Sequence, residues 1–175
     1  REIPYFKLPD LLPHDVTHKY PFGKLKLFKS VPIISINLWF DRGVMDIDFV
    51  GLVQKNLQWV FNKHRIMCET QKPDNYITAV ISGGYKYIHL TKDELVSLAI
   101  KDLTEVFPMI KTATLKHSLV IKEKRATFSA TSDIEQYRPN YETPVENLFL
   151  AGDWTNTGLP ATIEGAVQSG FECAR

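Results

Sequence analysis

The stretch NLFLAGDWTNTGLPATIEGAVQSG, from Asn147 to Gly170, contains the pattern that decides the fold of this chain. It begins with the continuous apolar run 148–151, which is typical of a strand buried on both faces of a parallel sheet. A polar turn follows, and then a helical segment that opens with Pro160, a residue favoured at the first helical position. Ligands bind beyond the carboxyl ends of strands in open α/β sheets, so we expect the turn 152–158 to lie at a binding site.

The predicted helix is rich in small residues at four-residue spacing, with Ala161, Gly165 and Ser169 on one line. A glycine inside a helix costs about 1 kcal/mol relative to alanine. Gly165 and Gly170 therefore predict that other groups approach the helix backbone closely. The free amides at the start of such a helix suit an anionic or electron-rich ligand.

Asp153 follows the first glycine of the turn. A carboxylate beside a pyrophosphate would be repelled, so a ligand-binding Asp153 would accept hydrogen bonds from sugar or ribityl hydroxyls. The alternative is an aspartate that only stabilises the turn. The residue pattern alone does not separate these two hypotheses.

The rest of the chain predicts an α+β fold, with a mixed or antiparallel sheet flanked by helices. Segments rich in β-branched and aromatic residues predict strands at 32–42, 57–63, 76–84 and 114–131. The clearest helix follows Thr91, which forms a capping-box pattern with Glu94, and Pro108 ends it. We expect this helix to cover one face of the sheet.

Composition limits the function classes. The 175 residues are 44% hydrophobic and 23% charged, as in soluble globular proteins, and the net charge of +1 does not favour nucleic-acid binding. No apolar run of about 18 residues predicts a membrane-spanning helix. Cys68 and Cys173 lie far apart without CxxC spacing, which favours free thiols over a disulfide.

Two other kinds of chemistry receive little support. His14 and His18 have the spacing of a metal-binding pair, but no third ligand is in view, so we predict no metal site. The GxSxG pattern of many acyl-transfer enzymes is absent.

The stretch from Asn147 to Gly170 resembles the C-terminal FAD-binding signature of the amine oxidase/phytoene desaturase flavoprotein superfamily. The segments PIISINLWFDRGVMD, QWVFNK, KEKRATFSAT and RPNYETPVENLFLAGDW are similar in particular to the squalene-associated branch, the hydroxysqualene dehydroxylases. The resemblance covers roughly residues 25–175. Plant-type phytoene and ζ-carotene desaturases share the WFDR strand and the EGAV-SG helix, but their turn is usually rich in Lys or Gln. The turn 156–160 is NTGLP instead, which favours the squalene-associated branch.

The resemblance implies an FAD site in which Gly152 and Asp153 hold the ribityl–phosphate part and residues 159–162 lie against the flavin ring. The implied FAD-binding residues are Gly152, Asp153, Trp154, Gly158, Leu159, Pro160, Ala161, Thr162 and Gly165. No catalytic side chain stands out, because in this class the flavin itself exchanges the hydride and the protein orients the substrate.

The candidate substrate-binding residues are Trp59 and Arg125. Arg125 and Arg138 fall in matching segments and could stabilise a leaving hydroxyl or the flavin, unless they are surface or loop arginines. The apolar side chains that could line a substrate tunnel, or could simply form the core, are Val50, Leu52, Val53, Leu57, Trp59 and Phe61.

The other half of the family's cofactor site is an N-terminal strand–GxGxxG–helix, and no GxGxxG occurs in this sequence. The resemblance therefore implies part of a substrate-binding domain at 1–146, and at 147–175 the terminal strand and helix of a Rossmann-type FAD domain whose N-terminal half is absent. Such a fragment would bind FAD weakly or not at all. Its terminal strand needs backbone partners, so we expect 147–175 to pair with another copy, as a homo-oligomer, or with the substrate-domain sheet.

The implied activity is hydride transfer between FAD and a long isoprenoid, with hydroxysqualene reduced to squalene in hopanoid or carotenoid biosynthesis. The alternatives are a phytoene or carotenoid desaturase, an amine oxidase, and a non-catalytic α+β interaction module. The resemblance implies a cytoplasmic enzyme whose hydrophobic substrate would require peripheral contact with the inner membrane surface.

Overall fold

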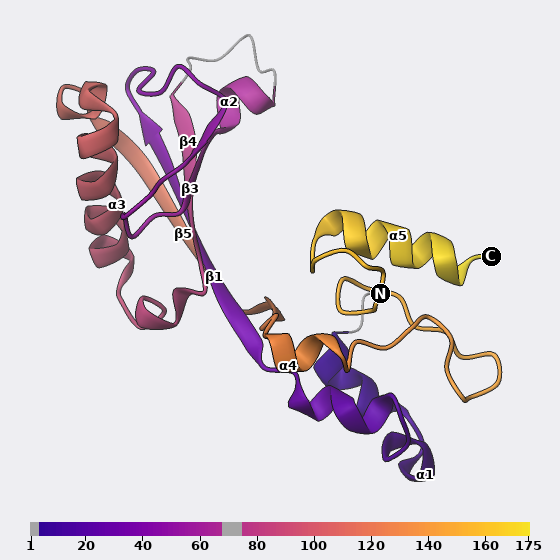
Figure 1. Ribbon diagram of the computed structural model, residues 1–175. Helices are drawn as coiled ribbons and strands as arrows, with labels where there is room; N and C mark the ends of the chain where they lie inside the picture. Colours follow the sequence, from indigo (N-terminus) through magenta and orange to yellow (C-terminus); the bar gives the residue numbers. More distant parts are fainter. Residues whose placement is uncertain (1–3, 68–74) are drawn as a thin grey trace. The chain divides into compact units, whose positions relative to one another are not determined.

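The computed structural model describes residues 4–67 and 75–175, and the chain divides into two compact units (Figure 1). The first, which we name the sheet unit, is Val31–Lys124. The second, the signature unit, is Arg1–Ser30 together with Arg125–Arg175. The predicted segment 147–175 thus shares a unit with the first 30 residues. The predicted functional division, with substrate binding at 1–146 and FAD binding at 147–175, stays a prediction.

The sheet unit is built on five strands in the order β2-β3-β4-β1-β5. The pairs β2–β3, β3–β4 and β4–β1 run antiparallel, with Ile36 of β1 and Val60 of β3 on either side of Ala79 in β4. The strands are β1 (Ser30–Phe40), β2 (Phe49–Gly51), β3 (Trp59–Asn62), β4 (Tyr76–Ser82) and β5 (Leu115–Phe128). The predicted strands and the predicted α+β fold are confirmed.

The core of the sheet unit lies between the sheet and helix α3 (Lys92–Val106), which Figure 1 shows alongside the strands. Alternate residues of β1 and β4 point to this side, as the pleat requires. Both hydrogen bonds of the predicted capping box, between Thr91 and Glu94, are present. The main core side chains are Ile34, Ile36, Leu38, Ile77, Ala79, Ile81, Leu95, Ala99 and Leu103. The helix therefore covers one face of the sheet, as predicted.

Asp102 is a buried carboxylate on α3 and the main polar link to the loop before β3. Its Oδ2 accepts hydrogen bonds from the backbone amides of Asn56, at 2.7 Å, and Leu57, at 3.1 Å. The side-chain amide of Asn56 also donates to this carboxylate, at 3.1 Å. Since buried amides need acceptors, Asp102 ties the loop to the helix.

Short helices complete the sheet unit and form most of the signature unit. The sheet unit contains α2 (Lys63–Ile66), η3 (Gly84–Lys86) and η4 (Pro108–Lys111). The signature unit contains η1 (Tyr5–Leu11), α1 (His14–Thr17), η2 (Phe22–Leu27), α4 (Ser132–Glu135) and α5 (Ile163–Cys173). Its own apolar core consists of Tyr5, Phe22, Leu25, Phe28, Phe128, Ile134, Leu150 and Trp154.

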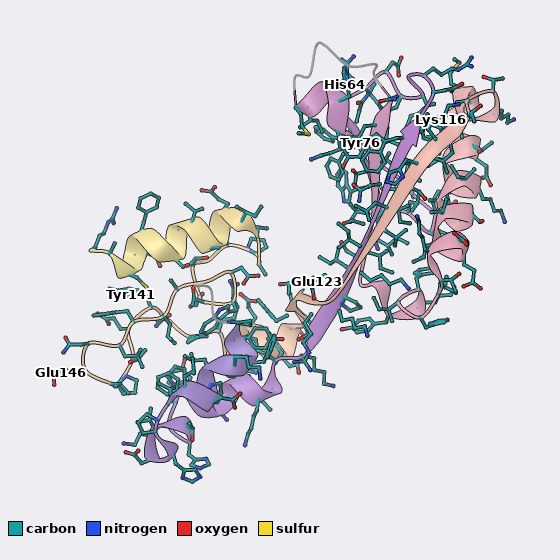
Figure 2. All side chains as sticks on the ribbon, turned by 180° about the vertical axis from the view of Figure 1, so that it is seen from behind. His64, Tyr76, Lys116, Glu123, Tyr141 and Glu146 are labelled. Carbon is teal, nitrogen blue, oxygen red and sulfur yellow. The ribbon has the colours of Figure 1, made fainter. Side chains whose placement is uncertain are left out.

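The predicted strand at 148–151 does not form a ladder. Phe149 makes one isolated antiparallel bridge to Glu142, and the amide of Leu150 donates to the carbonyl of Tyr141, which Figure 2 labels. An apolar run forms a buried strand only where neighbouring strands pair with it. Among the described residues, its pairing partner is the loop that contains Tyr141 and Glu142. The segment does not join the five-stranded sheet, so that expected pairing is wrong. Pairing with another copy stays a prediction.

The terminal helix begins later than predicted. Thr162 is the N-cap of α5, and its Oγ1 accepts a hydrogen bond from the amide of Gly165 at 3.2 Å. Pro160 has no side-chain oxygen that could satisfy a helix amide, and it lies in the turn before the cap.

The thiol of Cys173 is free and donates a hydrogen bond to the carbonyl of Leu150 at 2.9 Å. Burial, together with the nearby Glu172 carboxylate, raises the pKa of this thiol. Cys68 lies outside the described residues. Within 4–67 and 75–175, no helix is both long and apolar enough to pass through a bilayer.

Candidate cofactor site

The turn between Leu150 and α5 is built on a glycine that no other residue can replace without strain. Gly152 has φ of 149°, and a Cβ there would lie 2.5 Å from Nε1 of Trp154. Its amide donates to Oγ of Ser169 at 2.8 Å, and its carbonyl accepts from Oγ1 of Thr155 at 2.8 Å. The backbone of Gly152 is therefore held on both sides, and the indole of Trp154 occupies the position where a side chain would stand.

Asp153 is half-buried in this turn, and Thr127 orients its carboxylate. Oγ1 of Thr127 donates to Oδ2 of Asp153 at 3.0 Å. Thr127 comes from the end of β5 and was not among the predicted site residues, because its contact spans a separation of 26 residues. The side chain of Asp153 thus has a defined direction, which suits a carboxylate that accepts hydrogen bonds from a ligand.

The second half of the turn leads into the capped start of α5. Gly158 has φ of 75°, a conformation that favours glycine. Leu159 and Ala161 are half-buried, whereas Pro160 and Thr162 are exposed. These residues form a continuous surface that ends at the free amides of the first helical turn.

Gly165 confirms the close approach that its position in the helix predicts. A Cβ at Gly165 would lie 2.9 Å from the carbonyl oxygen of Pro160. Gly170 behaves differently, because a Cβ there would meet no atom of the described residues within 4 Å. On α5 the apolar side chains of Ile163, Val167 and Phe171 are exposed.

Trp154 points into the core of the signature unit. It is 6% exposed, and its ring centroid lies 6.5 Å from that of Tyr5. Its indole packs against Gly152, so Trp154 shapes the turn from the protein core.

Arg138, for which the sequence left open a role toward the flavin or a place among the surface or loop arginines, lies in this site. Its guanidinium is buried and donates hydrogen bonds to three carbonyl oxygens of the turn, those of Asp153, Thr155 and Leu159. It also pairs with Glu135 at 2.7 Å. Arg138 is thus neither a surface arginine nor a simple loop arginine.

The two candidate substrate residues belong to different compact units. Trp59, in the sheet unit, is 45% exposed and packs beside Phe49 and Phe61. Arg125, in the signature unit, lies with its guanidinium carbon 4.7 Å from the ring centroid of Phe6. The proposed tunnel residues do not form one surface, because Leu57 is in the core and Val53 is 84% exposed.

The sheet face opposite α3 carries a polar network. Oδ1 of Asn37 accepts hydrogen bonds from the hydroxyls of Tyr76 and Thr78, both at 2.8 Å. The ring of Tyr76, labelled in Figure 2, stacks on Trp39 with centroids 4.3 Å apart. Trp59 lies on this same face, because its register partner in β4 is Val80, two residues from Thr78.

His14 and His18 do contact each other, with their Nε2 atoms 3.3 Å apart. In the part of the chain that the structure describes, no three His, Cys, Asp or Glu side chains are grouped so that they could hold a metal ion.

Comparison with known proteins places this geometry in a family. The 15-cis-phytoene desaturase of Synechococcus elongatus is 31% identical over 175 residues, which cover 96% of this chain and 37% of that protein. The hydroxysqualene dehydroxylase of Sinorhizobium fredii is 34% identical over 142 residues, which cover 81% of this chain and 31% of that protein. The chain thus spans about a third of the length of these curated relatives.

Solved structures share the fold. The crystal structure of a protein from Exiguobacterium sp. 255-15 has a TM-score of 0.67 and 14% identity, covering 98% of this chain and 39% of that one. The family model described as "Flavin containing amine oxidoreductase" matches residues 8–175. This chain therefore belongs to the flavin-containing amine oxidoreductase family.

Proposed function

We propose that this chain supplies one wall of the FAD site and the substrate-facing sheet of an oxidoreductase that transfers a hydride to or from a long isoprenoid. The observation that supports the proposal is the hydrogen-bonded turn from Gly152 to Thr162, in a chain that belongs to a flavin-containing family. We also propose that the signature unit belongs to the cofactor domain and the sheet unit to the substrate domain, in place of a division at residue 146.

The residues present fit one side of the cofactor. The absence of a side chain at Gly152 lets the indole of Trp154 pack against the turn, and Thr127 directs the carboxylate of Asp153. In this proposal Asp153 accepts hydrogen bonds from the ribityl hydroxyls. Residues 159–162 and the first amides of α5 contact the electron-rich edge of the flavin ring. When bound, the flavin supplies the hydride chemistry, and this chain orients it.

Two isoprenoid classes are candidates for the substrate. Relatives named phytoene desaturases match nearly the whole chain, as the 96% coverage by the Synechococcus protein illustrates. A relative named hydroxysqualene dehydroxylase, from Zymomonas mobilis, is 37% identical over a shorter span of 125 residues. Phytoene is therefore the first substrate to test and hydroxysqualene the second. In either case the aromatic face that includes Trp39, Trp59 and Tyr76 suits contact with a hydrocarbon chain.

The experiment compares Asp153→Asn with Glu146→Gln in the protein encoded by the complete reading frame. Glu146 is a matched control, because it is an exposed carboxylate in the loop before the turn (Figure 2). Loss of one charged acceptor is worth about 1.5–3 kcal/mol. We expect the Asp153 variant to bind FAD about 10- to 100-fold more weakly and the control to bind it normally. Product analysis with phytoene and with hydroxysqualene then identifies the substrate.

The proposal fails if the wild-type protein retains no flavin absorbance after incubation with FAD and removal of the unbound FAD. It also fails in its assignment of Asp153 if both variants bind FAD equally well. A flavoprotein that converts neither isoprenoid but oxidises an amine would contradict the substrate class.

We further propose a peripheral contact with an anionic membrane surface through residues 17–30. This segment contains Lys19, Lys24, Lys26 and Lys29 and no acidic residue. The side chains of Phe22 and Leu25 in η2 and of Phe28, its C-cap, are buried at three-residue spacing, as a 3₁₀ helix allows. The lysines and Leu27 are consequently exposed.

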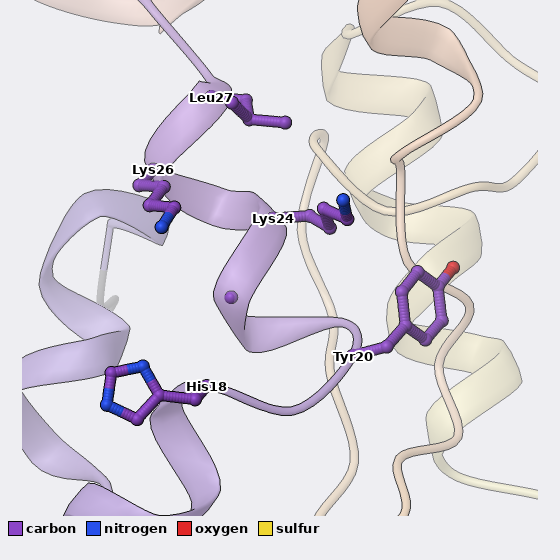
Figure 3. Close-up of a pocket in the computed structure, with 6 residues that line it drawn as sticks. His18, Tyr20, Lys24, Lys26 and Leu27 are labelled. Atoms are coloured by element: carbon purple, nitrogen blue, oxygen red, sulfur yellow. The ribbon is translucent and has the colours of Figure 1, made fainter.

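This basic surface also contains a shallow hollow of about 250 Å³. Figure 3 shows its side chains arranged around η2, and one of them, Lys24, has its Nζ 5.0 Å from the ring of Tyr137. The lining residues are His18, Tyr20, Gly23, Lys24, Lys26 and Leu27. Cations beside apolar side chains suit the phosphate groups and upper acyl region of a lipid surface.

Sedimentation with vesicles tests this contact. A lysine near an anionic surface is worth about 1 kcal/mol, so Lys24→Gln with Lys26→Gln should weaken binding to phosphatidylserine vesicles about 30-fold. The matched control is Lys92→Gln with Lys101→Gln on α3. Equal losses for the two pairs, or equal binding to neutral vesicles, would contradict the proposal.

A further inference from the structure

The guanidinium of Arg138 is a buried hub beneath the turn that carries the candidate cofactor residues. Arg138 is 3% exposed. Its Nη1 donates to the carbonyl of Leu159 at 2.8 Å, and its Nη2 donates to those of Asp153 at 3.1 Å and Thr155 at 2.6 Å. One planar group therefore contacts three separate peptides of the turn.

These contacts join the two halves of the site. Asp153 is the candidate hydroxyl-binding residue, and Leu159 begins the segment that faces the flavin ring in the proposed function. Nη1 and Nη2 are rigidly separated by the guanidinium plane, so their partners are held at a set spacing. The flexible ammonium of a lysine could not hold Leu159 and Asp153 at once with this geometry.

The segment after Arg138 strengthens the same framework. The amide of Asn156 donates to the carbonyl of Pro139 at 2.8 Å, and its side-chain amide donates to Oδ1 of Asn140 at 3.3 Å. The turn is thus attached to residues 138–140 through backbone and side chains.

The charge of Arg138 is only partly compensated. Its ion-pair partner Glu135 has a side chain that is 54% exposed, so water screens that carboxylate. The guanidinium carbon lies 5.6 Å from the ring centroid of Phe128, and Nε has no hydrogen-bond partner among the described residues. The other acceptors that Arg138 contacts are the neutral carbonyl groups of the turn.

We propose that Arg138 is a positioning residue that preforms the flavin site by fixing Asp153 relative to Leu159. The inference rests on the proposed function, because it assigns a role toward the same cofactor. Arg138 acts through the three carbonyls and does not touch the reacting atoms. The turn is consequently ordered before the cofactor arrives, and the flavin environment depends on the fork geometry of the arginine.

The test uses the protein from the complete reading frame with Arg138→Lys, Glu135→Gln and Ile134→Val. Lysine keeps the positive charge but lacks the planar guanidinium that contacts several carbonyl groups at once, so the dissociation constant for FAD should rise about tenfold or more. The flavin absorbance band and the midpoint potential of the flavin should also shift. Glu135→Gln keeps all three carbonyl contacts and should retain FAD. Ile134→Val removes a methyl group from the same core and controls for a general loss of stability.

A second measurement does not depend on whether the arginine variant folds. Hydrogen exchange of the wild-type protein, with and without FAD, should show that the hydrogen-bonded amides of Thr155 and Asn156 are protected in both states. Exchange of these amides at the unfolded rate in the FAD-free protein would overturn the inference. So would an Arg138→Lys protein with unchanged FAD affinity, spectrum and potential. A wild-type protein without any flavin binding would instead refute the proposed function itself.

Discussion

Gly165 and Gly170 of α5 offer a matched pair of alanine substitutions with opposite expected effects on stability. The two glycines lie in the same helix of 11 residues, so their intrinsic helix propensity is the same. Their surroundings differ. A Cβ at Gly165 would lie 2.9 Å from the carbonyl oxygen of Pro160, whereas one at Gly170 would meet nothing within 4 Å.

The expected magnitudes follow from these distances. Replacing a helical glycine by alanine gains about 1 kcal/mol, and at Gly170 nothing opposes that gain. At Gly165 the same gain is opposed by a contact with backbone, which must move or bend at a cost of about 1–3 kcal/mol. The carbonyl of Pro160 cannot move easily, because Arg138 holds the neighbouring carbonyl of Leu159. We therefore expect Gly170→Ala to stabilise the protein and Gly165→Ala to destabilise it, with a difference of about 1–3 kcal/mol.

Urea denaturation of the 175-residue chain measures the difference, followed by tryptophan fluorescence and by circular dichroism. The two variants should have the same m-value and midpoints shifted in opposite directions. Equal shifts would mean that the carbonyl of Pro160 does not press on the helix. A stabilised Gly165→Ala protein would refute the reasoning about close approach.

Three further changes have expected outcomes that follow from single contacts. Asp102→Ala should lower the free energy of unfolding by about 2–5 kcal/mol in urea denaturation, because two buried backbone amides lose their acceptor. Ser169→Ala should cost about 1–2 kcal/mol in the same assay, because the amide of Gly152 loses its acceptor. Hydrogen bonds from Thr91 lower the pKa of Glu94, so its stabilising effect is present above the unfolded pKa of about 4.3 and lost as the pH falls through the folded pKa. An NMR titration should therefore find a higher Glu94 pKa in Thr91→Ala than in the wild type.

Each of these outcomes has a control that can contradict it. Lys101→Ala, on the exposed side of α3, should change stability by less than about 0.5 kcal/mol, and an equal loss in Asp102→Ala would contradict the role of the buried carboxylate. Ser169→Thr keeps the hydroxyl, so it should retain the acceptor that Ser169→Ala lacks. An unchanged Glu94 pKa in Thr91→Ala would show that the hydroxyl of Thr91 does not donate to the Glu94 carboxylate in solution.

Local patterns in the sequence were sufficient to predict the sheet unit. The alternation of Ile34, Ile36 and Leu38 with polar residues indicates a strand, and the Thr91–Glu94 pair marks the start of α3. Both signals act over a few residues, so they do not depend on the rest of the fold. The predicted close approach to the helix backbone is confirmed at Gly165 and wrong at Gly170.

Several features of the signature unit could not be predicted, because they depend on contacts that a local sequence pattern does not contain. Arg138 reaches carbonyl groups 15 to 21 residues away, and nothing in the dipeptide Arg138–Pro139 indicates that it will be buried. The start of α5 was placed at Pro160 on a positional preference, whereas the side-chain oxygen of Thr162 determines it. The apolar run before Gly152 resembled a sheet strand, but a strand also requires partners, which composition does not reveal.

The course of the chain through its two units has a consequence for how such proteins diversify. Residues 31–124 form an uninterrupted insert within the signature unit, and the chain enters and leaves this insert through β1 and β5, which are neighbours in one sheet. An insert with adjacent ends can be exchanged as a cassette without lengthening any connection or disturbing the turn at Gly152. A change of sequence confined to residues 31–124 would in this way leave the hydrogen bonds of that turn in place.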